Sequence, residues 1–74
     1  MIAIIKTNNP VTLSFAQAVL RDGDIEFFVA DTHVSILEGS IGAIPRRLMV
    51  LEDDEGDARE ALAGAGLEKE LQPV

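Results

Sequence analysis

Residues 2–11 read IAIIKTNNPV, and this stretch decides the fold because a strand, a stop and a helix start follow one another in it. The segment from Ile2 to Thr7 is rich in β-branched residues and apolar on both alternating faces, which predicts a central, buried strand. Asn9 can cap a helix, and Pro10 suits the first helical position, where no backbone N–H is needed. A strand followed at once by a helix is therefore expected.

The helix expected over residues 11–22 is apolar around more than half of its circumference. Its polar stripe is narrow and consists of Ser14, Gln17 and Arg21. A helix of this kind should be well buried. We expect Gly23 to end it in the left-handed conformation that glycine adopts without strain.

Three more elements are predicted downstream. Residues 25–30 predict a second strand, in which Phe28 lies on the face opposite its apolar neighbours. Residues 46–51 predict a third strand that is apolar on both faces. Residues 54–65 predict a second helix with an apolar stripe and an acidic first turn, which complements the helix dipole.

The order β-α-β-β-α predicts an α+β fold, the ferredoxin-like split β-α-β sandwich, with two helices on one face of an antiparallel sheet. Residues 1–67 form the expected single domain, and residues 68–74 form either a tail or a short fourth strand. The helices leave the other sheet face uncovered, so Phe28, Met49 and Leu51 are expected to form an exposed apolar surface there. Such a surface usually binds a partner, and a homo-oligomer is the simplest case.

Composition excludes several classes of protein. The chain of 74 residues carries a formal charge of −7, and residues 52–74 hold eight acidic side chains against two basic ones, so no nucleic acid partner is expected. The absence of cysteine excludes disulfides and thiolate chemistry. The apolar run from Ile2 to Ile5 is too short to cross a membrane, and no signal-peptide pattern precedes it. A cytoplasmic location without membrane contact is the expectation.

The central segment carries the most distinctive sequence of the chain. Residues 31–50 read DTHVSILEGSIGAIPRRLMV, preceded by TNNPV at residues 7–11 and followed by AREAL at residues 58–62. With these stretches the chain resembles the putative prokaryotic signal-transducing protein family over residues 2–66. The resemblance implies a ferredoxin-like fold similar to that of the PII signal proteins, which oligomerise and bind small effectors and partner proteins. No residues match the nucleotide-binding motifs of PII proteins, so the resemblance implies no ATP site.

The connection over residues 31–45 is long for so small a domain, and loops of this length are usually functional or disordered. Its many apolar residues argue against disorder. One interpretation is that it lines a ligand cleft or docks on a partner, and the other is that it folds over its own core. The sequence leaves both open.

A candidate anion site lies within this region. The glycines near residue 40 can expose backbone N–H groups, and Arg46 and Arg47 can supply guanidinium groups to a phosphate or carboxylate. The alternative is two turn glycines and a solvated arginine pair at the start of a strand. The residues expected to bind a ligand or partner are Asp31, His33, Glu38, Gly39, Ser40, Gly42, Arg46 and Arg47.

Catalysis and metal binding find little support in the same segment. Asp31, His33 and Ser35 alternate, but neighbours two apart on a strand lie about 6.5 Å apart, beyond the hydrogen bonds of a catalytic triad. A lone His33 near Asp31 and Glu38 is a weak metal pattern. We therefore predict no catalytic residue, no metal and no cofactor.

The expected function is a non-enzymatic regulatory domain that binds a small anionic effector or a partner protein through residues 31–47. The alternatives are a protein-interaction module without a small ligand and, more remotely, a small hydrolase using His33.

Overall fold

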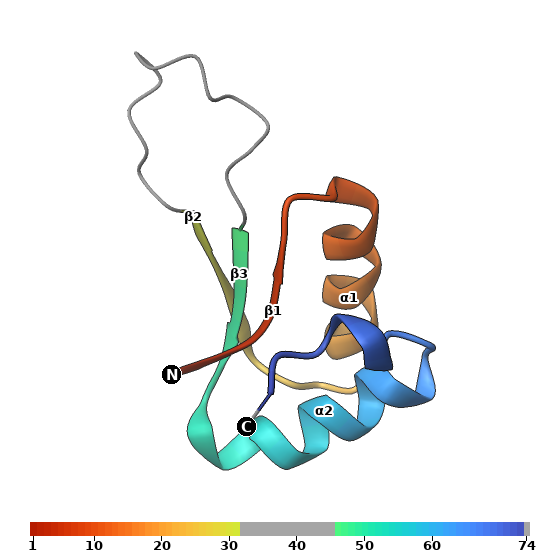
Figure 1. The fold of residues 1–74 in the computed structure, drawn as a ribbon. Coiled ribbons are helices and arrows are strands. Elements are labelled where there is room, and N and C mark those ends of the chain that lie inside the picture. The colour runs from red at the N-terminus through yellow and green to blue at the C-terminus, as the bar shows by residue number, and fades with distance from the viewer. Residues whose placement is uncertain (32–45, 74) are drawn as a thin grey trace.

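The computed structural model describes residues 1–31 and 46–73. It contains three strands, two α-helices and two short 3-10 helices, arranged as two layers (Figure 1). Their order is β1 (Ile2–Thr7), α1 (Pro10–Asp22), β2 (Phe27–Asp31), β3 (Arg46–Val50), η2 (Glu52–Asp54), α2 (Glu55–Gly64) and η3 (Glu68–Glu70). The predicted β-α-β-β-α order and the ferredoxin-like α+β class are confirmed.

The three strands form one antiparallel sheet in the order β1-β3-β2. The prediction that β1 is the central strand is wrong, because β3 lies between the other two. The sequence left open whether the C-terminal residues form a tail or a short fourth strand, and residues 67–71 do not form a full strand. Leu71 makes a single antiparallel bridge to Ile5, and the N–H of Gln72 donates to the carbonyl of Ile4 at 2.8 Å.

A β-bulge explains why β1 is apolar on both sides in the sequence. The register with β3 shifts between Ala3 and Ile5, so Ile4 is an extra residue. Ile4 and Ile5 are both fully buried in the same core. A bulge of this kind turns two successive side chains to one side of a sheet. Ala3 and Lys6 of β1 therefore lie on the opposite face of the sheet.

Local side-chain chemistry starts α1 as predicted. Asn9 Oδ1 accepts hydrogen bonds from the N–H of Val11 at 2.9 Å and of Thr12 at 3.4 Å. Pro10 occupies the first helical position, and the N–H of Asn9 donates to Thr7 Oγ1 at 3.0 Å. The turn from β1 into α1 is therefore fixed by its own residues.

The prediction that α1 is well buried is wrong. Only one stripe, Leu13, Ala16 and Leu20, is buried. Val11 is 74% exposed and Phe15 is 47% exposed. The sheet and α2 cover one side of the helix, and nothing else among the described residues is placed to cover the other.

The end of α1 also differs from the prediction. Gly23 has φ −90°, and the residue with positive φ is Asp24, at 56°. The N–H of Asp24 donates to Arg21 O, and the N–H of Ile25 donates to Leu20 O at 2.9 Å. These two bonds define a Schellman motif, whose left-handed position is one residue after the helix cap. Asp tolerates that conformation better than most residues.

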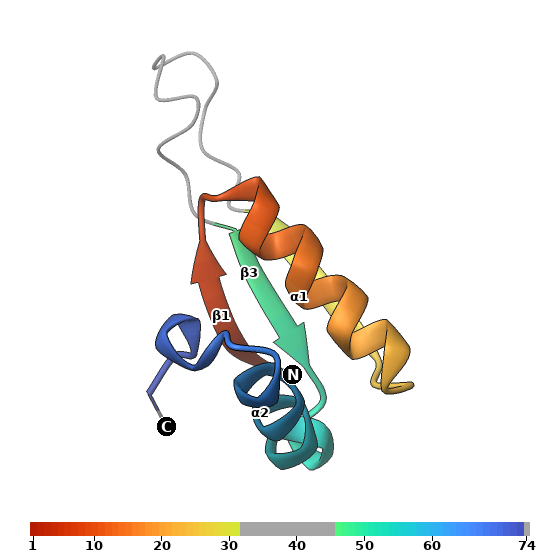
Figure 2. The ribbon, with the colours of Figure 1, turned by 90° about the vertical axis from the view of Figure 1, so that its right-hand side faces the viewer.

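The second helix ends in the same way. Gly66 has φ 90°, its N–H donates to Ala63 O, and the N–H of Leu67 donates to Leu62 O at 2.9 Å. Ala58 and Leu62 form the buried stripe of α2. Both helices lie on the same side of the sheet (Figures 1 and 2). The core between the layers consists of Ile4, Ile5, Leu13, Ala16, Leu20, Leu48, Val50, Ala58, Leu62 and Leu67.

Candidate functional site

The candidate site is the end of the sheet where β2 stops and β3 begins. Arg46 and Arg47 are the first two residues of β3, and both are exposed. Asp31, the last residue of β2, lies opposite Arg46 in the register. His33, Glu38, Gly39, Ser40 and Gly42, which were also predicted to bind, lie outside the described residues, as does Ser35.

The register brings a third cation to this end of the sheet. Lys6 of β1 lies directly opposite Arg47, and Ala30 of β2 lies opposite Arg47 on its other side. Directly opposed residues of antiparallel strands share a face and have Cα atoms about 4.5–5.5 Å apart. Two exposed cations in this position repel each other unless an anion lies between them. Lys6, Arg46 and Arg47 are called the basic end of the sheet below.

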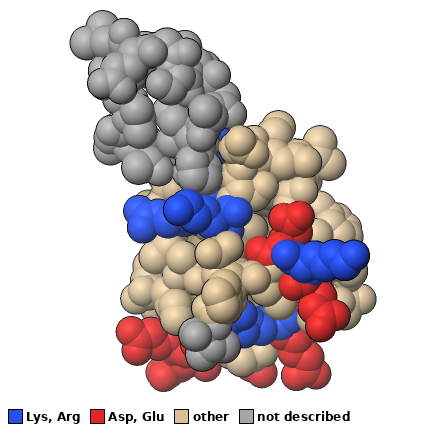
Figure 3. Space-filling view, in the orientation of Figure 1, with Lys and Arg blue, Asp and Glu red and all other residues tan. Residues whose placement is uncertain are grey.

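Arg21, Arg59 and Lys69 lie beside acidic or aromatic residues, and Arg46 itself lies opposite Asp31. Arg59 Nε donates to Glu55 Oε2 at 2.9 Å, and the Arg21 guanidinium lies 5.5 Å from the centroid of the Phe27 ring. Lys69 lies between Glu68 and Glu70 in the sequence. The acidic residues 52–57 follow β3 at its other end. Figure 3 shows a basic band at about mid-height on the left of the view, with acidic side chains at the bottom and around a second basic group on the right. The molecule is therefore strongly acidic but has one basic end.

The sheet face opposite the helices carries the predicted apolar surface. Ala3, Met49 and Phe28 form one cross-strand row on this face. Phe28 is 56% exposed, Met49 is half-buried, and Leu51, which follows β3 in an extended conformation, is 42% exposed. The row lies next to the row that contains Lys6 and Arg47. Phe28, Met49, Leu51 and Ala3 are called the open face below.

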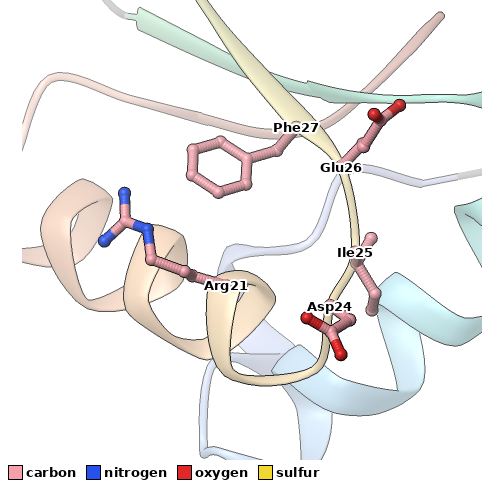
Figure 4. Close-up of a pocket in the computed structure, with 5 residues that line it drawn as sticks. All are labelled: Arg21, Asp24, Ile25, Glu26 and Phe27. Carbon is pink, nitrogen blue, oxygen red and sulfur yellow. The ribbon is translucent and has the colours of Figure 1, made fainter.

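A surface hollow that the sequence did not indicate lies between the end of α1 and the start of β2. Its volume is about 360 Å³, and it is lined by Arg21, Asp24, Ile25, Glu26 and Phe27 (Figure 4). The Arg21 side chain lies beside the Phe27 ring, whereas Glu26 points to the other side of the strand. The sequence shows only a charged turn at this place. The cation–π contact between Arg21 and Phe27 could not be predicted, because it depends on the direction in which the chain leaves α1.

Neither a metal-binding cluster nor a membrane-spanning helix is found among the described residues. Within residues 1–31 and 46–73, no three His, Cys, Asp or Glu side chains lie close enough together to hold a metal ion. The same residues contain no helix that is both long and apolar enough to cross a membrane.

Comparison with known proteins gives one family. The sequence profile of the family described as "Putative prokaryotic signal transducing protein" matches residues 1–66 of the chain. This range includes all three strands, both α-helices, the basic end and the open face. No curated protein matches the chain.

Proposed function

The chain belongs to the putative prokaryotic signal transducing protein family, and we propose that it is a non-enzymatic regulatory domain that binds a small anionic effector. The proposed site is the segment over residues 31–47 together with the basic end of the sheet. Within that segment, Asp31, His33, Glu38, Gly39, Ser40 and Gly42 remain the proposed binding residues, with Arg46 and Arg47 supplying positive charge.

One observation carries this proposal: Lys6 lies directly opposite Arg47 on an exposed sheet face, with Arg46 next in the chain. A protein with a formal charge of −7 repels anions over most of its surface. Two directly opposed, exposed cations are therefore unfavourable without an anion beside them. A phosphate or carboxylate ligand removes the repulsion between Lys6 and Arg47 and makes charge-assisted hydrogen bonds with the Arg47 guanidinium.

A thermal-shift screen tests the proposal. The probes are inorganic phosphate, nucleotides, and di- and tricarboxylates. A ligand present at 100 times its Kd stabilises the native state by about 2.7 kcal/mol, which raises the Tm of a domain of this size by more than about 10 °C. We expect at least one probe to raise the Tm, and the rise to shrink at high salt because ions screen exposed charges.

Matched variants locate the site. The Arg46→Ala/Arg47→Ala variant should lose the shift, and Lys6→Ala should weaken it. The control variant Arg21→Ala/Lys69→Ala removes the same number of charges elsewhere and should keep the shift. A shift that survives in Arg46→Ala/Arg47→Ala, or is lost equally in the control, would remove the basic end as the site.

A second function, a protein-interaction module without a small ligand, is favoured by the open face. Phe28 and Leu51 are large apolar side chains that remain about half exposed. An apolar face of this kind commonly binds another protein, and a second copy of the chain is the simplest partner. If no probe in the screen raises the Tm while Phe28→Ser or Leu51→Ser disrupts an assembly in solution, this second function holds and the first does not.

A further inference from the structure

The two edge strands of the sheet, β1 and β2, differ in what pairs with their outer sides. At the β1 edge, a bulge interrupts the strand at Ile4, and the C-terminal tail pairs with it through Leu71 and Gln72. At the other edge, and within the part of the chain that the structure describes, β2 pairs with β3 alone. Among the described residues, the β1 edge is therefore covered by the tail, and the β2 edge presents its outward backbone N–H and carbonyl groups.

The middle of β2 lacks the proline, lysine and bulge that often protect an edge strand, and its charged neighbours Glu26 and Asp31 lie at its two ends. The strand reads FFVAD over residues 27–31, without proline or lysine, and its pairing with β3 runs through five residues without a bulge. No charged side chain lies between Phe27 and Ala30. An apolar edge without a bulge is a template for pairing with another strand.

We propose that a second copy of the chain pairs along β2, antiparallel, about a two-fold axis at Val29. Val29 is the midpoint of the strand, so this register pairs all five of its residues. Phe27 then lies opposite Asp31 of the second copy, Phe28 opposite Ala30, and Val29 opposite Val29. Opposed residues share a face in an antiparallel pair, so the helices of both copies lie on one side of a continuous six-stranded sheet.

The pairing accounts for an exposed aromatic side chain on an edge strand. Phe28 is 56% exposed in the single chain, and the small side chain of Ala30 from the second copy leaves room for its ring. Contact across the new strand pair would bury part of this ring. The open faces of the two copies become one surface, and Lys6 and Arg47 lie on the strands away from the new contact. The inference does not depend on the anion site.

Light scattering and cysteine cross-linking test the arrangement. The chain has no cysteine, so a single introduced thiol reports on one position. The wild type should show a mass of twice the 7.9 kDa of one chain, falling on dilution. Salt should strengthen the pair, because two chains of charge −7 repel each other. Under mild oxidation, Val29→Cys should form a disulfide dimer, since directly opposed Cα atoms lie within disulfide range.

Leu51→Cys, on the open face and outside β2, is the matched control and should not cross-link. Ala30→Lys places a charge on the edge and should give a single-chain mass, so the arrangement is tested even if Val29→Cys folds poorly. A wild type that stays at the single-chain mass at millimolar concentration would overturn the proposal. Cross-linking through Leu51→Cys but not Val29→Cys would also overturn it, because the copies would then associate through their open faces.

Discussion

Arg59 holds the C-terminal tail against the sheet. Its Nε donates to Glu55 Oε2 at 2.9 Å, and its Nη1 donates to the carbonyl oxygen of Gln72 at 2.6 Å. The N–H of Gln72 in turn donates to Ile4 O in β1. The Arg59 side chain is 19% exposed, so water competes with these bonds only in part. A single side chain thus connects α2, the tail and the covered edge of the sheet.

We expect Arg59→Ala to lower the free energy of unfolding by about 1–2 kcal/mol, since a partly buried carbonyl loses a charged donor. Amide hydrogen exchange at Gln72 should become faster, and urea denaturation gives the stability. Arg59→Lys keeps the charge but lacks the planar, two-directional guanidinium, so its effect should be intermediate. Unchanged exchange at Gln72 in Arg59→Ala would show that the tail is held without this residue.

The residues that could be predicted from the sequence are those whose partners are close in the chain. Asn9 and Pro10 start α1 as expected because the cap needs only the next three residues. The left-handed residue was expected at Gly23 but occurs at Asp24, since a Schellman motif places it after the cap rather than at it. Arg46 and Arg47 were recognised as a pair, but Lys6 was missed, because only the register of β1 with β3 brings it beside Arg47.

At the scale of elements, two of the three glycines in the α2 region, Gly56 and Gly66, differ in conformation. Gly66 has φ 90° at the Schellman turn, whereas Gly56 lies inside α2. A Cβ added at either position meets no atom within 4 Å. Substitution at Gly66 therefore tests backbone conformation alone, and Gly56 is a control with the same free space.

Gly66→Ala should lower the free energy of unfolding by about 1 kcal/mol, because alanine is strained at positive φ. Gly56→Ala should raise it by up to about 1 kcal/mol through helix propensity. Thermal or urea denaturation of the two variants beside the wild type gives both values. Changes of the same sign would contradict the assignment of the helix end.

The elements themselves were predicted more accurately than their packing. The strand and helix order follows from local periodicity, and the observed element boundaries differ from the predicted ones by at most two residues. The burial of α1 was overestimated because periodicity shows how much apolar surface a helix has, not how much of it the neighbouring layer covers. Val11 and Phe15 are exposed for that reason. The central place of β3 depends on pairing between distant strands, which a single sequence does not specify.

At the scale of the whole molecule, charge and apolar surface are separated. Acidic residues 52–57 follow β3 at one end, the basic end of the sheet lies at the other, and the open face lies between them. The sequence predicted an acidic C-terminal third and an apolar face without helices. It did not predict a cationic row next to that apolar face, because the row is formed by β1 and β3 together.

The central claim is that the basic end of the sheet binds an anion. The most direct measurement is a titration of the ¹⁵N-labelled chain with the anion that raises the Tm most, followed by amide chemical shifts. The account predicts saturable shifts centred on Lys6, Arg46 and Arg47, absent in Arg46→Ala/Arg47→Ala, with α2 unaffected. Shifts centred elsewhere, or none at saturating anion, would contradict it.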